Sequence, residues 1–174
     1  MVQDIVKELG HLSLGTRFKR IGDQLQAQAQ ALLAAAGMDM PASHFPLLAA
    51  LDRLGPLGVG ELGQAVGVSQ PVVSRSLRGL EAEGLVRSAG VEGDLRMRHV
   101  RLSRKGQQLV QRAQAEVWPA IEAAVAQACA SLRGSLLEQL AGLEAALSEA
   151  PLQQRAGIPL STPARAQRRG RAPA

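Results

Sequence analysis

Apolar residues recur at intervals of three and four along most of the chain, which is the periodicity of an amphipathic helix. The first such stripe predicts a helix over 14–36, with Gly37 as its stop. Its apolar positions are Leu14, Phe18, Ile21, Leu25, Ala29, Leu32 and Ala36. A second helix is predicted over 42–53, before the Gly-Pro-Leu-Gly run at 55–58 breaks the pattern.

Two short helical patterns separated by a tight junction come next. The first covers 60–66, and Gly67 with Val68 forms the turn after it. Ser69 is expected to cap the second helix, which has Pro71 in its first turn, a strong start signal. This helix should end at Gly84. Its predicted inward residues are Val73, Leu77 and Leu80.

The pattern then changes to two short strands, predicted at 85–87 and 98–102, with the polar stretch 88–97 as an extended hairpin tip. Ser103 is expected to cap a further helix, whose apolar positions are Leu109, Ala113, Val117, Ile121, Val125 and Ala128. Pro119 predicts a kink in it, because proline lacks the N–H that would bond back to Ala115. Gly134 interrupts the pattern. The last stripe consists of Leu136, Leu140, Leu143 and Leu147.

Composition supports this helical interpretation. Of 174 residues, 46% are hydrophobic, yet only Phe18, Phe45 and Trp118 are aromatic, which disfavours a large β-sandwich core. The single cysteine excludes an intramolecular disulfide framework and fits a reducing cytosol. No stretch approaches the roughly 18 uninterrupted apolar residues of a membrane helix. The sequence therefore predicts a soluble, cytoplasmic, mainly helical protein without membrane contact.

Positive charge is concentrated in two places. Residues 151–174 contain five arginines and no acid, and with four prolines they are predicted to form a disordered basic tail. Residues 69–106 hold eight basic and four acidic side chains, so their net charge is +4 within a body (1–150) of zero net charge. A basic segment on an otherwise acidic body is typical of a nucleic-acid contact face, although a solvated charged surface explains it equally well.

The order of helix, tight turn, helix and two-stranded hairpin is that of a winged helix-turn-helix. In this arrangement the tip of the second helix enters a DNA major groove, and the hairpin reaches toward the minor groove. The candidate groove contacts on this helix, in addition to Ser69 and Pro71 at its start, are Gln70, Ser74, Arg75 and Arg78. In the hairpin, Arg96 and Arg98 are the candidate wing contacts, with Asp94 as the carboxylate that orients them.

A set of short motifs in fixed order strengthens this interpretation. It comprises Glu61 and Leu62, Val68 and Ser69, Ser74 and Arg75, Leu80 and Glu81, Gly84 to Val86, Asp94 and Arg96, and finally Leu102, Ser103 and Gly106. Over roughly 42–106 the set resembles the MarR family of bacterial transcriptional regulators. The resemblance implies a homodimer in which the first helix and the last two helices interlock, and a palindromic DNA operator read by one helix from each subunit.

Other motifs in the sequence have simpler explanations. Residues 58–63 spell GxGxxG, but the preceding segment is helical by spacing, so no parallel βαβ unit for a dinucleotide is expected. His11, His44, His99 and Cys129 show no metal-ligand spacing, and neither a metal nor a cofactor is predicted. Cys129 sits between alanines, as an inert buried thiol does, although a redox role stays open.

The predicted protein is mainly α, a winged helix-turn-helix with flanking dimerisation helices. Residues 1–40 and 107–150 supply the dimerisation helices, 41–106 bind DNA, and 1–150 form one domain. The predicted function is a non-enzymatic, dimeric, sequence-specific transcriptional regulator, a repressor of double-stranded operator DNA that responds to a small-molecule effector. The alternative is a ligand-binding or protein-interaction module of the same fold without specific DNA binding. The operator sequence and the effector's identity stay open.

Overall fold

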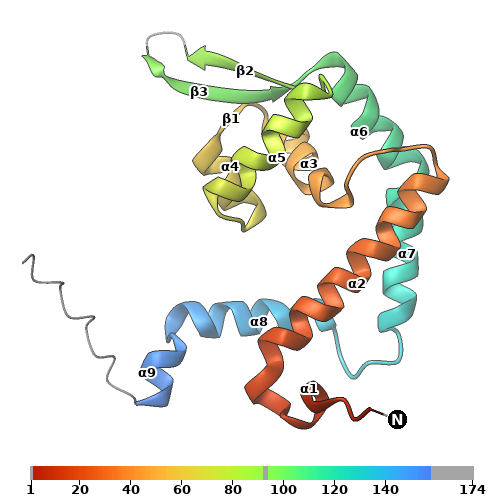
Figure 1. The fold of residues 1–174 in the computed structure, drawn as a ribbon, viewed down its shortest axis with the longest axis vertical. Helices are drawn as coiled ribbons and strands as arrows, with labels where there is room; N and C mark the ends of the chain where they lie inside the picture. Colours follow the sequence, from red (N-terminus) through yellow and green to blue (C-terminus); the bar gives the residue numbers. More distant parts are fainter. Residues whose placement is uncertain (1, 92–93, 158–174) are drawn as a thin grey trace, which may run out of the picture. The chain divides into compact units, whose positions relative to one another are not determined.

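The computed structural model describes the backbone of residues 2–91 and 94–157, and the side chains of these residues except 91 and 94–98. The chain divides into two compact units, Met1–Ala126 and Gln127–Ala174. Figure 1 shows the order of their elements along the chain. No helix in the described part is long and apolar enough to span a lipid bilayer.

The first unit begins with three helical segments, α1 (Ile5–Glu8), the 3₁₀ turn η1 (Gly10–Ser13) and α2 (Leu14–Ala35). The helix predicted over 14–36 is confirmed, and the backbone turns at Gly37 with a φ of +67°. The two short segments before it were not predicted, because neither is long enough to show a periodic apolar stripe. They are held by polar bonds instead: the Ser13 hydroxyl donates to the Val6 carbonyl at 2.5 Å.

The central part contains η2 (Ala42–His44), α3 (Phe45–Leu54), α4 (Val59–Val66) and α5 (Gln70–Ala82). The helix predicted over 42–53 therefore starts as a 3₁₀ turn and becomes α-helical at Phe45. Both short helices predicted after it are confirmed, to within one or two residues at their ends. Gly67 ends α4 in the left-handed conformation, with a φ of +71°, which glycine adopts without steric cost.

The predicted two-stranded hairpin is confirmed, and the sheet contains a third strand that was not predicted. It has three antiparallel strands, β1 (Leu57–Gly58), β2 (Val86–Val91) and β3 (Asp94–Leu102), in the order β1-β3-β2. Two residues are too few to show alternation, so β1 could not be recognised before its pairing with β3 was known. The stretch 88–97, predicted as a tip, is largely strand, because backbone pairing such as that of Ala89 with His99 continues whatever the side chains are. Figure 1 shows β2 and β3 extending as a long hairpin.

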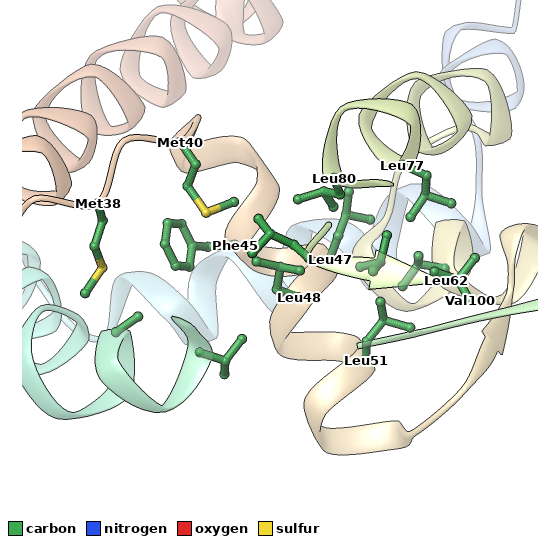
Figure 2. Packing of buried hydrophobic residues seen from close by; sticks show 14 of the residues in the cluster. Met38, Met40, Phe45, Leu47, Leu48, Leu51, Leu62, Leu77, Leu80 and Val100 are labelled. Carbon is green, nitrogen blue, oxygen red and sulfur yellow. The ribbon is translucent and has the colours of Figure 1, made fainter. Parts of the chain in front are cut away.

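One hydrophobic core joins the helices and the sheet of the first unit (Figure 2). The predicted inward residues of α5 are confirmed, with exposures of 0% for Val73, 5% for Leu77 and 0% for Leu80. Figure 2 shows Met38, Met40 and Phe45 at one end of the cluster, and the Phe45 ring meets Trp118 edge to face at 6.0 Å. The other fully enclosed members of the core include Leu33, Leu48, Leu62, Val86, Val100 and Val110.

The predicted kink at Pro119 is confirmed as a break between α6 (Arg104–Glu116) and α7 (Trp118–Cys129). Val117 separates the two helices and still bridges them, because its N–H donates to Ala113 and its carbonyl accepts from Ile121, both at 3.0 Å. The start of α6 also follows the prediction. The Ser103 hydroxyl accepts from the Gly106 N–H at 3.0 Å, as an N-cap does.

The second unit contains α8 (Leu136–Glu149) and α9 (Leu152–Ala156). Gly134 precedes α8 with a φ of +73°, in agreement with the predicted interruption. The short helix α9 corrects the prediction of disorder at the beginning of the tail. Arg155 stabilises it by donating from Nε to the Ala150 carbonyl at 2.7 Å, a bond between residues that composition does not reveal. The remainder of the predicted disordered tail, 158–174, lies outside the described residues.

Candidate nucleic-acid interface

The junction between α4 and α5 is a tight helix-turn-helix. The Val68 N–H donates to the Gly63 carbonyl at 3.0 Å, which closes the turn after α4. A Cβ atom at Gly63 would lie 2.8 Å from the Val68 carbonyl oxygen, so only glycine permits this approach. Glycine at position 63 therefore allows the turn between α4 and α5 to be this tight.

Ser69 occupies the predicted N-cap position of α5, but its side chain makes no capping hydrogen bond, which corrects the prediction. Its carbonyl accepts from the N–H groups of Val72 and Val73, at 3.0 and 3.1 Å, and these backbone bonds begin the helix. Pro71 in the first turn has no N–H group, and a backbone N–H at that position would have no acceptor within the helix. The Ser69 residue is exposed, so its hydroxyl is available to a partner in solution.

The outward face of α5 carries the predicted polar contacts. Gln70, Pro71, Arg75 and Arg78 are exposed, and Ser74 is half-buried. The amide nitrogen of Gln70 lies 2.9 Å from the place where Gly60 would carry a Cβ, so this side chain reaches toward the start of α4. The structure thus brings these five residues together at one end and along one side of a single helix.

Val72 belongs to the same surface and was not among the predicted contacts. Its side chain is 48% exposed, while Val73, its neighbour in sequence, is fully buried. The signal was present in the sequence, since Val72 falls outside the inward spacing of Val73, Leu77 and Leu80. A valine on a helix tip can make apolar contact with a thymine methyl group in the major groove.

The wing is formed by β2 and β3. Asp94 and Arg98 are in register with Val91 and Gly90 of β2, and Arg96 lies between them on β3. The side chains of these three predicted residues are outside the described set, so their roles stay predictions. The wing is joined to α5 by a bond from the Ser88 hydroxyl to the Glu81 carboxylate, which fixes the two elements relative to each other.

The arginines of α5 have no carboxylate partner among the described side chains. The ion pairs found there join Lys19 to Asp23, Arg20 to Asp4 and Arg112 to Glu116, all outside the helix-turn-helix and the wing. Glu81, the acid within α5, accepts a hydrogen bond from the Ser88 hydroxyl. Arg75 and Arg78 are therefore available to an anionic partner.

The GxGxxG run at 58–63 forms a helix start. The Glu61 carboxylate accepts from the Gly58 N–H at 2.7 Å, as in a capping box. The preceding strand β1 runs antiparallel to β3, whereas a dinucleotide site needs a parallel βαβ unit. Within the residues that the structure describes, no three histidine, cysteine, aspartate or glutamate side chains are grouped as metal ligands.

Comparison with known proteins shows what this region is similar to. Residues 38–97 match the sequence model of the MarR family. A search of curated protein sequences gave no match. The matched segment includes α3, α4, α5 and most of the wing, which are the elements of the candidate interface.

Solved structures with this fold are numerous. The transcriptional regulator BldR from Sulfolobus solfataricus is 25% identical with a TM-score of 0.62, and the match covers 85% of this chain and 99% of BldR. A MarR family transcriptional regulator from Silicibacter pomeroyi is 27% identical with a TM-score of 0.57, over 83% of this chain and 94% of its own. A mutant MarR from E. coli, crystallised with operator DNA, shares the fold at 19% identity and a TM-score of 0.64, over 84% and 98% of the two chains.

Proposed function

We propose that the chain is a member of the MarR family and a dimeric, sequence-specific DNA-binding transcriptional regulator, because residues 38–97 match the family model and two solved transcriptional regulators are 25% and 27% identical to it. The observation that carries the proposal is the outward face of α5. It presents an amide, an exposed valine and two guanidinium groups that form no ion pair with the described side chains, on the outward face of a helix-turn-helix. These are the groups that read base edges and neutralise phosphates in a major groove.

Within this surface, Arg75 is the residue proposed to contribute most, since it lies one turn after the helix start and is exposed. Gln70 and Ser74 contact base edges beside it, Arg78 holds phosphate, and Ser69 and Pro71 position the first turn. Arg96 and Arg98 bind in the adjacent minor groove, oriented by Asp94. The base pairs of the operator opposite Val72 are expected to be rich in thymine, because the methyl groups of the Val72 side chain can make apolar contact with the thymine methyl group but cannot form a hydrogen bond.

DNA binding is tested by selecting bound fragments from genomic DNA and measuring the affinity of the selected duplex by fluorescence anisotropy. The affinity should fall about 10³–10⁵-fold between 50 and 200 mM salt if six to ten phosphates are contacted. Arg75→Ala should weaken binding by about 1–3 kcal/mol. Arg133→Ala removes the same charge from an exposed position between α7 and α8, which belongs neither to the helix-turn-helix nor to a helix of the proposed dimer, and serves as the matched control. A DNA affinity that does not change with salt concentration, or an Arg75→Ala variant that binds DNA as tightly as the control, would refute the proposal.

The dimer is proposed to form through the N-terminal and C-terminal helices, 1–40 and 107–150. Four apolar side chains on one stripe of α2 are exposed in the single chain: Phe18 by 40%, Ile21 by 48%, Leu25 by 40% and Leu32 by 41%. An isolated stripe of this length would expose apolar surface to water, which a second copy removes. Two copies would present their α5 helices to the two half-sites of a palindrome.

The oligomeric state is tested by light scattering after size exclusion. Ile21→Asp should convert a dimer to a monomer, because it would place a charge on the proposed apolar interface. Ala27→Asp introduces the same charge on the opposite, exposed side of α2 and should leave the dimer intact. A wild-type protein that is monomeric at micromolar concentration would refute this part of the proposal.

We further propose that the protein is a cytoplasmic repressor whose operator affinity responds to a small ligand. A cavity of about 340 Å³ between the segment after α2 and the start of α6 supports ligand binding. Its lining combines apolar side chains (Met38, Met40, Leu85, Leu109) with two cations (Lys105, Arg112) and two carboxylates (Asp39, Glu83). A reporter gene behind the selected operator should be less active when the protein is present. A compound screen on operator binding would reveal the effector, and a reporter that is activated would exclude repression.

A further inference from the structure

Three arginines meet at a hollow where the wing joins the helices. Arg87 of β2 and Arg101 of β3 are directly opposite each other in the antiparallel register. Arg104 is the first residue of α6. All three line one open cavity of about 430 Å³, together with residues from the end of α3 and the segment before β1. The structure thus gathers three guanidinium groups from elements that are far apart in the sequence.

The two strand arginines lie on the face of the sheet that is turned away from the core, and the hollow that they line reaches Leu51 and Leu102 at the edge of that core. Successive side chains of a strand point to opposite faces, and the neighbours of the two strand arginines, Val86 and Val100, are 2% and 1% exposed in the core. The buried residues of α5 pack into that same core. The strand arginines therefore point away from α5, and no residue of α4 or α5 lines the hollow.

Among the residues that the structure describes, carboxylates do not balance the positive charge in the hollow. Like charges directly opposite each other on neighbouring strands destabilise a sheet. Asp52 is the one carboxylate among the described lining residues, and its Oδ2 accepts from the Gln114 amide at 3.1 Å. None of the three arginines forms an ion pair within the described part of the chain. The positive end of the α6 dipole adds to the excess, since Arg104 stands at its N-terminus.

We propose that this hollow binds the phosphate group of a small organic phosphate. Three guanidinium groups and one carboxylate leave a formal charge of about two, which a phosphate dianion neutralises, and a guanidinium can hold two phosphate oxygens at once. The cavity volume falls in the range of about 300–1,000 Å³ that small-molecule sites occupy. The exposed side chains of Pro56 and Gln107 provide apolar and amide surface for the organic part. This binding does not require DNA.

Inorganic phosphate is the first probe, added to the full-length protein at constant ionic strength, with chloride and acetate as comparison anions. At about ten times its dissociation constant it should raise the thermal midpoint by about 3–6 °C, and acetate should raise it less. Glycerol phosphate should bind more tightly than inorganic phosphate in calorimetry, because its organic part also contacts the hollow.

Arg101→Gln and Arg87→Gln each remove one member of the opposed pair. In chloride both variants should be at least as stable as the wild type, because the repulsion is relieved, and in phosphate they should lose most of the shift. Arg133→Gln, with the same loss of charge elsewhere, should keep the full shift. Equal shifts in all four proteins, or no shift in the wild type, would overturn the proposal.

The same variants separate this site from the DNA-binding surface. Their affinity for a DNA duplex in chloride should stay within about threefold of that of Arg133→Gln. A loss of about tenfold or more in duplex affinity, with no phosphate-dependent shift in the wild type, would assign these arginines to the DNA backbone and overturn the small-ligand site. Phosphate binding in a protein that binds no DNA would support the site while refuting the proposed regulator.

Discussion

Adding a single methyl group at Gly106 tests how closely α6 approaches the strand segment beside it. A Cβ atom at this position would overlap the carbonyl oxygen of Leu85 and would lie 3.1 Å from its carbonyl carbon. The obstacle is backbone, so no side-chain rotation can relieve it. Gly106→Ala should therefore displace the start of α6 from the residues just before β2.

The expected destabilisation can be assembled from the bonds at this junction. The Ser103 N–H donates to the Leu85 carbonyl at 2.9 Å, and the Ser103 hydroxyl donates to the Gly84 carbonyl at 2.6 Å. Each such bond contributes about 0.5–1.5 kcal/mol, and overpacking costs about 1–3 kcal/mol. Alanine is favoured over glycine in a helix by about 1 kcal/mol, which offsets part of this loss. The net effect should be a loss of about 2–4 kcal/mol in the free energy of unfolding.

Urea denaturation followed by circular dichroism, at one fixed protein concentration, measures the change. Gly142→Ala is the control, because Gly142 is an exposed residue of α8 and a Cβ there would meet nothing within 4 Å. That variant should gain up to about 1 kcal/mol. If Gly106→Ala proved as stable as the wild type, the close approach of α6 to Leu85 would be refuted.

Three further predictions follow from the structure. Ser103→Ala should destabilise the protein by about 1–2 kcal/mol in urea denaturation, since a capping bond is lost, whereas Ser69→Ala should change stability by less than about 0.5 kcal/mol, and equal effects would contradict the assigned caps. The Arg20 side chain donates hydrogen bonds to the Asp4 carboxylate and lowers the pKa of that carboxyl below its usual 3.8. The stabilisation that the ionised Asp4 contributes to the folded state is therefore present above pH 3.8 and is lost as the pH falls through the lowered pKa. In an NMR titration Arg20→Gln should bring the pKa of Asp4 back toward 3.8, and an unchanged pKa would exclude the bond. Leu48→Ala should lower the free energy of unfolding by about 2–5 kcal/mol, because a fully enclosed side chain leaves a cavity, and a loss below 1 kcal/mol would show that the core is not packed as described.

The long helices and the helix-turn-helix were predictable because their signals are local. The spacing of Val73, Leu77 and Leu80 alone determines which face of α5 is buried, and Pro119 alone breaks the helix that contains it. The candidate contacts Arg75 and Arg78 followed directly, since they fall on the opposite face. Val72 could have been found by the same reasoning.

Packing decided features for which local signals are silent or misleading. Both Ser69 and Ser103 precede a helix, yet only the Ser103 hydroxyl accepts a capping bond, and that same hydroxyl is also fixed by Gly84, which lies 19 residues earlier. On α2 the predicted stripe contains Leu32, but Leu32 is 41% exposed. The neighbouring Leu33, which lies outside the stripe, packs into the core and is 2% exposed.

Thus the sequence by itself determined the mainly helical class, the order of elements and the exposed face of α5. The apolar periodicity and the effects of glycine and proline on the backbone depend only on residues a few positions apart, so they can be recognised without knowledge of the tertiary structure. Only the tertiary structure decided the third strand, the choice of cap and the meeting of Arg87, Arg101 and Arg104. These depend on contacts between segments distant in sequence, whose partners become defined only when the core has formed.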